Sequence, residues 1–186
     1  MKSVLFVLSS QAIKELDRRS EELGVPSLLL MESAGRGLAE ELRRWLIDGR
    51  GRRILGVCGK GGNGGDALCA LRYLGLWGAE VRAIVLGKPA GPGAPEFQAF
   101  SASFPERVRA VHEDEELEEL RDWFLWAEVV LDGILGVGVE GPAKGLAQQA
   151  IEKIREFPGL VVAVDLPSGL SGDSGKIPGP VVRANL

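Results

Sequence analysis

The sequence predicts an α/β fold in which helices cover both faces of a mostly parallel sheet. Short apolar runs bounded by glycine, such as 53–58 and 159–164, are typical of strands buried on both faces. Segments with helical periodicity separate these runs at a regular spacing, which favours crossover connections and therefore parallel strands. Two helical segments precede the first clear strand.

The two N-terminal helices have recognisable start and stop signals. Ser9 or Ser10 can cap a first helix that ends near Gly24, and Pro26 begins a second that runs to Trp45. The remaining elements are expected as a strand at 53–58, a helix at about 64–77, a strand at 80–86, a helix around 96–103, a weak strand at 108–111, an acidic helix at about 115–126, a strand at 128–131, a helix at about 146–157 and a strand at 159–164.

Length and composition indicate a single domain. The chain has 186 residues, of which 45% are hydrophobic and 26% charged, enough for one buried core. A net charge of −4 argues against nucleic acid or an anionic membrane surface as a partner. Cys58 and Cys69 fall in a predicted buried strand and helix, which favours a reduced, cytoplasmic setting. No segment is long enough to span a bilayer, so no membrane partner is expected.

The loop from Gly59 to Asp66 lies between a predicted strand and a predicted helix. Its glycines allow a sharp turn and close approach to a ligand, and helix-start amides can bind an anion. It fits neither the Walker A pattern nor the usual dinucleotide fingerprint. Asp66 would repel a phosphate at close range. The loop is therefore expected to contact sugar hydroxyls or a cation as well. Alternatively, Asp66 accepts backbone hydrogen bonds within the loop. A purely structural turn is the competing interpretation.

Two later strands also end in an acid. Asp132 is followed by a glycine-rich loop, and Asp165 by a turn that contains Ser168. In open parallel sheets the ligand crevice lies at the carboxyl ends of strands, so the three segments are expected to converge. Asn63, Asp132 and Ser168 would then offer hard oxygen ligands that suit potassium better than zinc. The alternative is that the acids cap turns and Ser168 caps a helix.

Four ordered motifs resemble the YjeF N-terminal domain family, the NAD(P)H-hydrate epimerases. They are LMESAG at 30–35, CGKGGNGGDA at 58–67, DGILGVG at 132–138 and VDLPSG at 164–169. The resemblance covers nearly the whole chain. It implies a Rossmann-like three-layer αβα sandwich and an isomerase that interconverts the R and S epimers of hydrated NAD(P)H, called NADHX and NADPHX, with the assistance of potassium.

The resemblance also implies a set of site residues. Potassium is expected at Asn63, Asp132 and Ser168. Substrate is expected against Gly62, Asn63, Gly64, Gly65, Asp66, Gly136, Val137, Gly138, Val139, Glu140, Gly141, Pro142 and Asp165. The hydroxyl to be inverted is on a ring carbon next to nitrogen, so its epimerisation needs proton transfer, and Asp165 is the expected catalytic acid/base.

Some positions depart from the family pattern. Gly62 stands where the family has an asparagine, and Gly141 where many relatives have an arginine, so Lys60 or Lys144 is a candidate to supply positive charge. Residues 181–186 look like the approach to a further strand. The single domain at 1–186 is therefore expected to lack its last one or two strands. Expected partners are a second copy of the chain and an ADP- or ATP-dependent NAD(P)HX dehydratase domain or protein.

The alternative function is a non-catalytic nucleotide-binding or dimerisation scaffold of the same fold. Asp66, Asp132 and Asp165 together favour catalysis, because a scaffold has little need for three acids around one pocket. A small kinase is a weaker alternative, since the chain has no Walker lysine.

Overall fold

The computed structural model describes residues 8–46, 52–91, 93–138 and 141–186. Its sheet contains five parallel strands in the order β3-β2-β1-β4-β5. They are β1 (Arg53–Cys58), β2 (Glu80–Leu86), β3 (Val108–Val111), β4 (Val129–Gly133) and β5 (Leu160–Ala163). The predicted α/β class and its parallel sheet are confirmed. The strand order reverses between β1 and β4, and a crevice is expected at this switch point.

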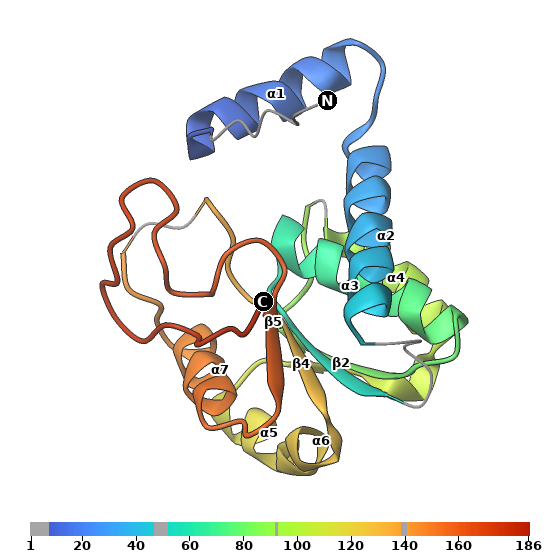
Figure 1. Ribbon diagram of the computed structural model, residues 1–186, viewed down its shortest axis with the longest axis vertical. Helices are drawn as coiled ribbons and strands as arrows, with labels where there is room; N and C mark the ends of the chain where they lie inside the picture. Colours follow the sequence, from blue (N-terminus) through green and yellow to red (C-terminus); the bar gives the residue numbers. More distant parts are fainter. Residues whose placement is uncertain (1–7, 47–51, 92, 139–140) are drawn as a thin grey trace.

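Helices cover both faces of the sheet, as Figure 1 shows. They are α1 (Ser10–Glu22), α2 (Ser27–Trp45), α3 (Gly62–Leu76), α4 (Gly93–Ser103), α5 (Asp114–Glu119), α6 (Arg121–Trp126) and α7 (Leu146–Arg155), with a 3₁₀ turn at Pro105–Arg107. One apolar layer joins α2, α3 and α4 to the sheet, and the other joins α5 and α7 to its opposite face. Helix α1 lies apart from both layers.

Strand β1 shows why the sheet needs both layers. Ile54 and Cys58 belong to the first apolar layer, whereas Leu55 and Val57 belong to the second. Successive side chains of a strand point to opposite faces, so an all-apolar run is buried only when both faces are covered. All four side chains are fully buried, and each large one contributes about 1.5–3 kcal/mol.

The single acidic helix predicted at about 115–126 is wrong. Two short helices, α5 and α6, occupy this segment and meet at Leu120. Leu117 and Trp123 both pack against the second apolar layer. In an unbroken helix these two side chains would point about 120° apart around the axis, so the break lets both face the core.

The C-terminal residues lie along the outer edge of β5. The Asn185 backbone N–H donates to the Val161 carbonyl at 2.8 Å, and the Ala163 N–H donates to the Leu186 carbonyl at 2.9 Å. The Asn185 side chain also accepts from the Val161 N–H at 2.9 Å. These bonds agree with the predicted approach to a strand at 181–186, while further strands stay a prediction. None of the helices among the described residues is long and apolar enough to cross a membrane.

Candidate functional site at the carboxyl ends of the strands

A cleft of about 900 Å³ opens where β1, β4 and β5 end. Its lining includes the loop after β1, the loop after β4 and Asp165 after β5. Parallel strands bring their carboxyl ends to one edge of the sheet, and the switch point between β1 and β4 separates the loops that follow. The three segments singled out in the sequence therefore meet in one place.

The glycine loop is shaped by contact between backbone segments. A Cβ atom on Gly59 would lie 2.1 Å from the Ile134 carbonyl oxygen, and one on Gly64 would lie 1.9 Å from the Gly59 carbonyl oxygen. Neither position has room for a side chain. By contrast, a Cβ on Gly61 would meet nothing within 4 Å. The loop places the first turn of α3, with its free backbone N–H groups, at the cleft.

Asp132 is a fully buried acid held by Ser168. Its carboxylate accepts the Ser168 hydroxyl at 2.6 Å and the Ser168 backbone N–H at 2.8 Å. The same hydroxyl accepts the Leu135 N–H at 2.9 Å, which ties the loop after β4 to the turn after β5. Burial raises the pKa of Asp132 above its ordinary value, although the bonds from Ser168 oppose that rise. These contacts bring two of the three predicted potassium ligands together.

Asn63 approaches the same place from α3. Its amide Nδ2 donates to the Leu135 carbonyl at 3.0 Å, while its Oδ1 is buried without a hydrogen-bond partner. Within the described residues no lysine or arginine pairs with Asp132. The orphaned amide oxygen of Asn63 and the Asp132 carboxylate without a counter-ion both belong to side chains that bond to the loop after β4. Such groups fit a monovalent cation, and the all-oxygen donor set suits potassium.

Asp165 is exposed and lines the cleft. Its Oδ2 accepts the Val137 backbone N–H at 3.1 Å, which fixes the direction of the carboxylate. A Cβ on Gly136 would lie 3.1 Å from that oxygen and 3.2 Å from the Asn63 Cβ. Glycine at 136 thus lets the loop after β4 pass between the two side chains, and the free face of the Asp165 carboxylate is available to a ligand.

Asp66 is half-buried and also lines the cleft. Burial, followed by the negative charges of Asp165, Glu96 and Asp17, raises its pKa from 3.8 to about 7. Among the described residues, no hydrogen bond joins the Asp66 carboxylate to the loop backbone. The alternative in which this acid ties the loop together is therefore not what the structure shows.

Comparisons with known proteins agree on one family. The family model described as YjeF-related protein N-terminus matches residues 27–186. The chain belongs to this family. It is 43% identical over 171 residues to a bifunctional NAD(P)H-hydrate repair enzyme of Pyrobaculum aerophilum, covering 91% of this chain and 34% of the relative. It is 33% identical to an NAD(P)H-hydrate epimerase of Elusimicrobium minutum, covering 96% of this chain and 82% of that protein.

A solved structure shows the same fold as this YjeF-related domain. The crystal structure of the yeast protein ynu0, YNL200c, superposes with a TM-score of 0.81 at 24% identity, covering 97% of this chain and 78% of that one. The chain spans about a third of the length of the bifunctional relatives, such as that of Hyperthermus butylicus, of which it covers 33%.

The other residues expected to bind substrate lie in different places. Gly62, Gly64, Val137 and Gly138 line the cleft with the residues described above. Gly65 does not, because its Cα faces Met31, whose sulfur would lie 2.5 Å from an added Cβ. Gly141 and Pro142 are exposed and do not line the cleft. Val139 and Glu140 lie outside the described residues.

Sequence reasoning missed the part that α1 and α2 play in this YjeF-related site. Ile13 and Asp17 of α1 line the cleft, as do Ala34 and Leu38 of α2. Helix α1 is anchored by buried Ser10, whose hydroxyl donates to the Val137 carbonyl at 2.8 Å. No local pattern in the sequence indicates that α1 reaches the carboxyl ends of the strands, since this depends on a contact across 127 residues.

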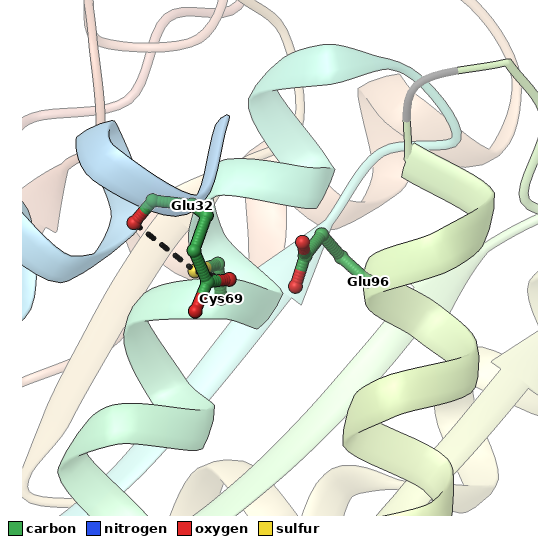
Figure 2. A group of neighbouring side chains, drawn as sticks. All are labelled: Glu32, Cys69 and Glu96. Atoms are coloured by element: carbon green, nitrogen blue, oxygen red, sulfur yellow. Dashed lines mark hydrogen bonds between the residues drawn. The ribbon is translucent and has the colours of Figure 1, made fainter. Parts of the chain in front are cut away.

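A second polar cluster lies outside the cleft lining. Figure 2 shows Glu32 of α2, Cys69 of α3 and Glu96 of α4 converging on one point. The guanidinium of Arg72 donates to both Glu32 oxygens at 2.8 and 2.6 Å, and the Tyr73 hydroxyl donates at 2.5 Å. A cation therefore already sits between the acids. Charge-assisted hydrogen bonds join α2 to α3, and an ion pair between Arg72 and Glu96 at 3.9 Å adds α4.

Proposed function

We propose that this domain interconverts the R and S epimers of NADHX and NADPHX with the assistance of potassium. The observation that carries the proposal is the convergence of three strand ends on one cleft, with Asp165 exposed to it and the Asp132–Ser168 pair beneath. Similar proteins support it, since the chain covers 82% and 75% of two proteins named NAD(P)H-hydrate epimerase, from Elusimicrobium minutum and Rhodopirellula baltica.

The chemistry of the substrate explains why a carboxylate is needed. The epimeric carbon bears a hydroxyl and adjoins the ring nitrogen, so its configuration is lost by departure of water or by ring opening. Both routes move a proton to or from oxygen. In this proposal Asp165 is the acid/base, because its Oδ2 is oriented by the Val137 N–H while its carboxylate faces the cleft. The glycine loop and the first turn of α3 receive the nucleotide phosphates.

The proposal places potassium against Asn63, Asp132 and Ser168. The ion would balance the buried Asp132 carboxylate and satisfy the unpaired Asn63 Oδ1. It would supply fixed positive charge beside the loop after β4, where substrate oxygens are expected. The side chains of the chain themselves bind and orient the substrate and move the proton.

Three wider expectations belong to the same proposal. The domain acts as a homodimer. It acts in the cytoplasm, in keeping with its two free buried cysteines. It works beside an ADP- or ATP-dependent NAD(P)HX dehydratase, because the bifunctional relatives are about three times as long as the matched segment. Size measurement in solution tests the homodimer, cell fractionation tests the location, and copurification with an NAD(P)HX dehydratase tests the partnership.

The direct experiment supplies purified protein with separated S- and R-NADHX and follows their interconversion by chromatography. Acceleration over the spontaneous rate is expected in potassium chloride and less acceleration in tetramethylammonium chloride of equal ionic strength. Asp165→Asn should lower kcat about 100-fold or more while substrate binding stays measurable. Asp122→Asn is the matched control, since Asp122 is exposed on α6, which precedes β4 at the far end of the sheet.

The outcomes separate catalysis from scaffolding. No acceleration by the wild-type protein, together with measurable binding of NADHX, would establish the non-catalytic scaffold instead. Near-normal turnover by Asp165→Asn would remove that residue from the mechanism. A rate independent of potassium would exclude the ion from the mechanism. If potassium takes part, Asn63→Ala should raise the potassium concentration that gives half-maximal activity.

A further inference from the structure

Three acids line the cleft, and Asp66 and Asp165 join Asp17 of α1 there from two other elements. Asp66 comes from the second turn of α3, and Asp165 from the turn after β5. Asn63 lies three residues before Asp66 and therefore on the same side of α3. A Cβ added to Gly136 would lie 3.2 Å from the Asn63 Cβ and 3.1 Å from the Asp165 Oδ2. The two carboxylates therefore belong to one pocket, and the charge of Asp165 acts on Asp66.

The position of Asp66 has no structural explanation within the described residues. Helix α3 begins at Gly62 with Gly61 as its N-cap, so Asp66 is the fifth helical residue, beyond the positions where an acid caps backbone N–H groups. No ion pair or hydrogen bond engages its carboxylate there. A half-buried acid without such a partner costs stability, which points to a functional reason for its presence.

Several charged groups face Asp66. The carboxylates of Asp165, Glu96 and Asp17 each raise its pKa, after the larger contribution of burial. Lys60 and Lys144 line the same cleft. With a pKa of about 7, Asp66 holds its proton in a large fraction of molecules at neutral pH. An acid whose pKa lies near the working pH is well suited to donate and accept a proton.

We propose that Asp66 is a second proton-transfer residue of this site, acting together with Asp165 on the hydroxyl-bearing carbon of the substrate. This inference rests on the proposed function. In one direction the Asp66 carboxyl gives its proton to the substrate hydroxyl, the C–O bond breaks, and water leaves with the bonding electron pair. The lone pair of the ring nitrogen forms a C=N bond, leaving an iminium ion and an Asp66 carboxylate.

Inversion follows when water adds to the opposite face. The Asp165 carboxylate takes a proton from this water as the new C–O bond forms, and the π electrons of the C=N bond return to nitrogen. One water has left, one has entered, and the proton count on the two acids is unchanged. The reverse reaction begins with the proton on Asp165 and ends with it on Asp66.

The pH dependence follows from this scheme. Both directions require one proton on the pair of acids, so they share one bell-shaped profile of kcat/KM. Because the proton on Asp66 is lost as the pH rises through its pKa, kcat/KM should fall about tenfold per pH unit above about 7. The fall should occur equally for S- and R-NADHX.

The test compares wild type, Asp66→Asn, Asp66→Glu and the control Asp122→Asn with both NADHX epimers. Asp66→Asn should lose about 100-fold or more in kcat in both directions, with KM changed by less than about threefold. Asp66→Glu should regain at least about a tenth of the wild-type kcat. It should also restore the fall of kcat/KM at high pH. Asp122→Asn should match the wild type.

Failure of this inference differs from failure of the proposed function. A wild type that does not accelerate epimerisation ends the proposed function. A wild type that does, with Asp66→Asn keeping more than a third of its kcat, ends only the role of Asp66. If Asp66→Asn does not fold, ¹³C NMR titration of the Asp66 carboxyl in the wild type decides: a midpoint near 7 supports the role, and a midpoint below about 5 overturns it.

Discussion

Replacing Asp66 by asparagine should stabilise the fold at alkaline pH and leave its stability nearly unchanged near pH 4. The Asp66 carboxyl has a pKa of about 7 in the folded chain against an ordinary value of 3.8, chiefly because it is buried. The folded state therefore holds this proton more tightly than the unfolded state. The contribution of Asp66 to folding stability must fall as the pH rises between these two values and stay at its lower level above about 7.

The magnitude follows from the size of the pKa change. One pKa unit corresponds to about 1.36 kcal/mol, so the rise from 3.8 to about 7 amounts to about 4 kcal/mol. Because Asp66 is only half-buried and solvent screens it, the expected difference is about 2 to 4 kcal/mol. Asparagine keeps the shape of the side chain and carries no charge, so it removes this cost.

Urea unfolding at pH 4, 5.5, 7 and 8.5 measures the effect in wild type, Asp66→Asn and the exposed control Asp122→Asn. The unfolding free energy of Asp66→Asn should exceed that of the wild type by about 2 to 4 kcal/mol at pH 8.5 and by about 0.6 kcal/mol or less at pH 4. Asp122→Asn should follow the wild type throughout. A difference for Asp66→Asn that stays constant with pH would refute the reasoning, because it would show that Asp66 titrates alike in both states.

Three further predictions concern contacts around the site. Gly64→Ala should lower the unfolding free energy by about 3 kcal/mol, whereas Gly61→Ala, whose Cβ meets nothing within 4 Å, should change it little in the same urea titration. Ser168→Ala removes a donor to buried Asp132 and should cost about 1 to 3 kcal/mol by thermal unfolding. Arg72→Met leaves Glu32 and Glu96 without their cation and should lower the unfolding free energy by about 2 to 4 kcal/mol. The control Arg36→Met breaks the exposed Arg36–Glu40 pair and should lower it by less than about 0.5 kcal/mol. Equal melting temperatures of these two variants would contradict the role given to Arg72.

Much of the fold follows from local patterns. The apolar run that forms β1 and the helical periodicity before Trp45 each identify one element. A strand buried on both faces is apolar throughout, and a helix buried on one side has apolar residues every three or four positions. The acidic segment was predicted less well. Leu120 separates two short helices, and this break lets Leu117 and Trp123 both pack into the core. The need for the break arises from the sheet that these side chains cover, which the local sequence does not reveal.

The candidate site was predicted in the same uneven way. The acids at the ends of β4 and β5 and the glycine loop after β1 are visible in the sequence, and parallel pairing requires their strand ends to share one edge. The structure places Asp132 and Ser168 within hydrogen-bond distance and turns Gly65 toward Met31. It also adds residues of α1 that no motif indicates.

The sequence by itself determined the α/β class, the order of the strands and most helices, and the three loops at the strand ends, because each leaves a pattern within about ten consecutive residues. Only the tertiary structure decided the burial of Asp66, the placing of α1 over the cleft and the joining of Glu32 to Arg72, 40 positions apart. Desolvation and charge interaction depend on which distant segments surround a group. A carboxylate with a pKa near neutrality is therefore a property of the folded chain, not of its local sequence.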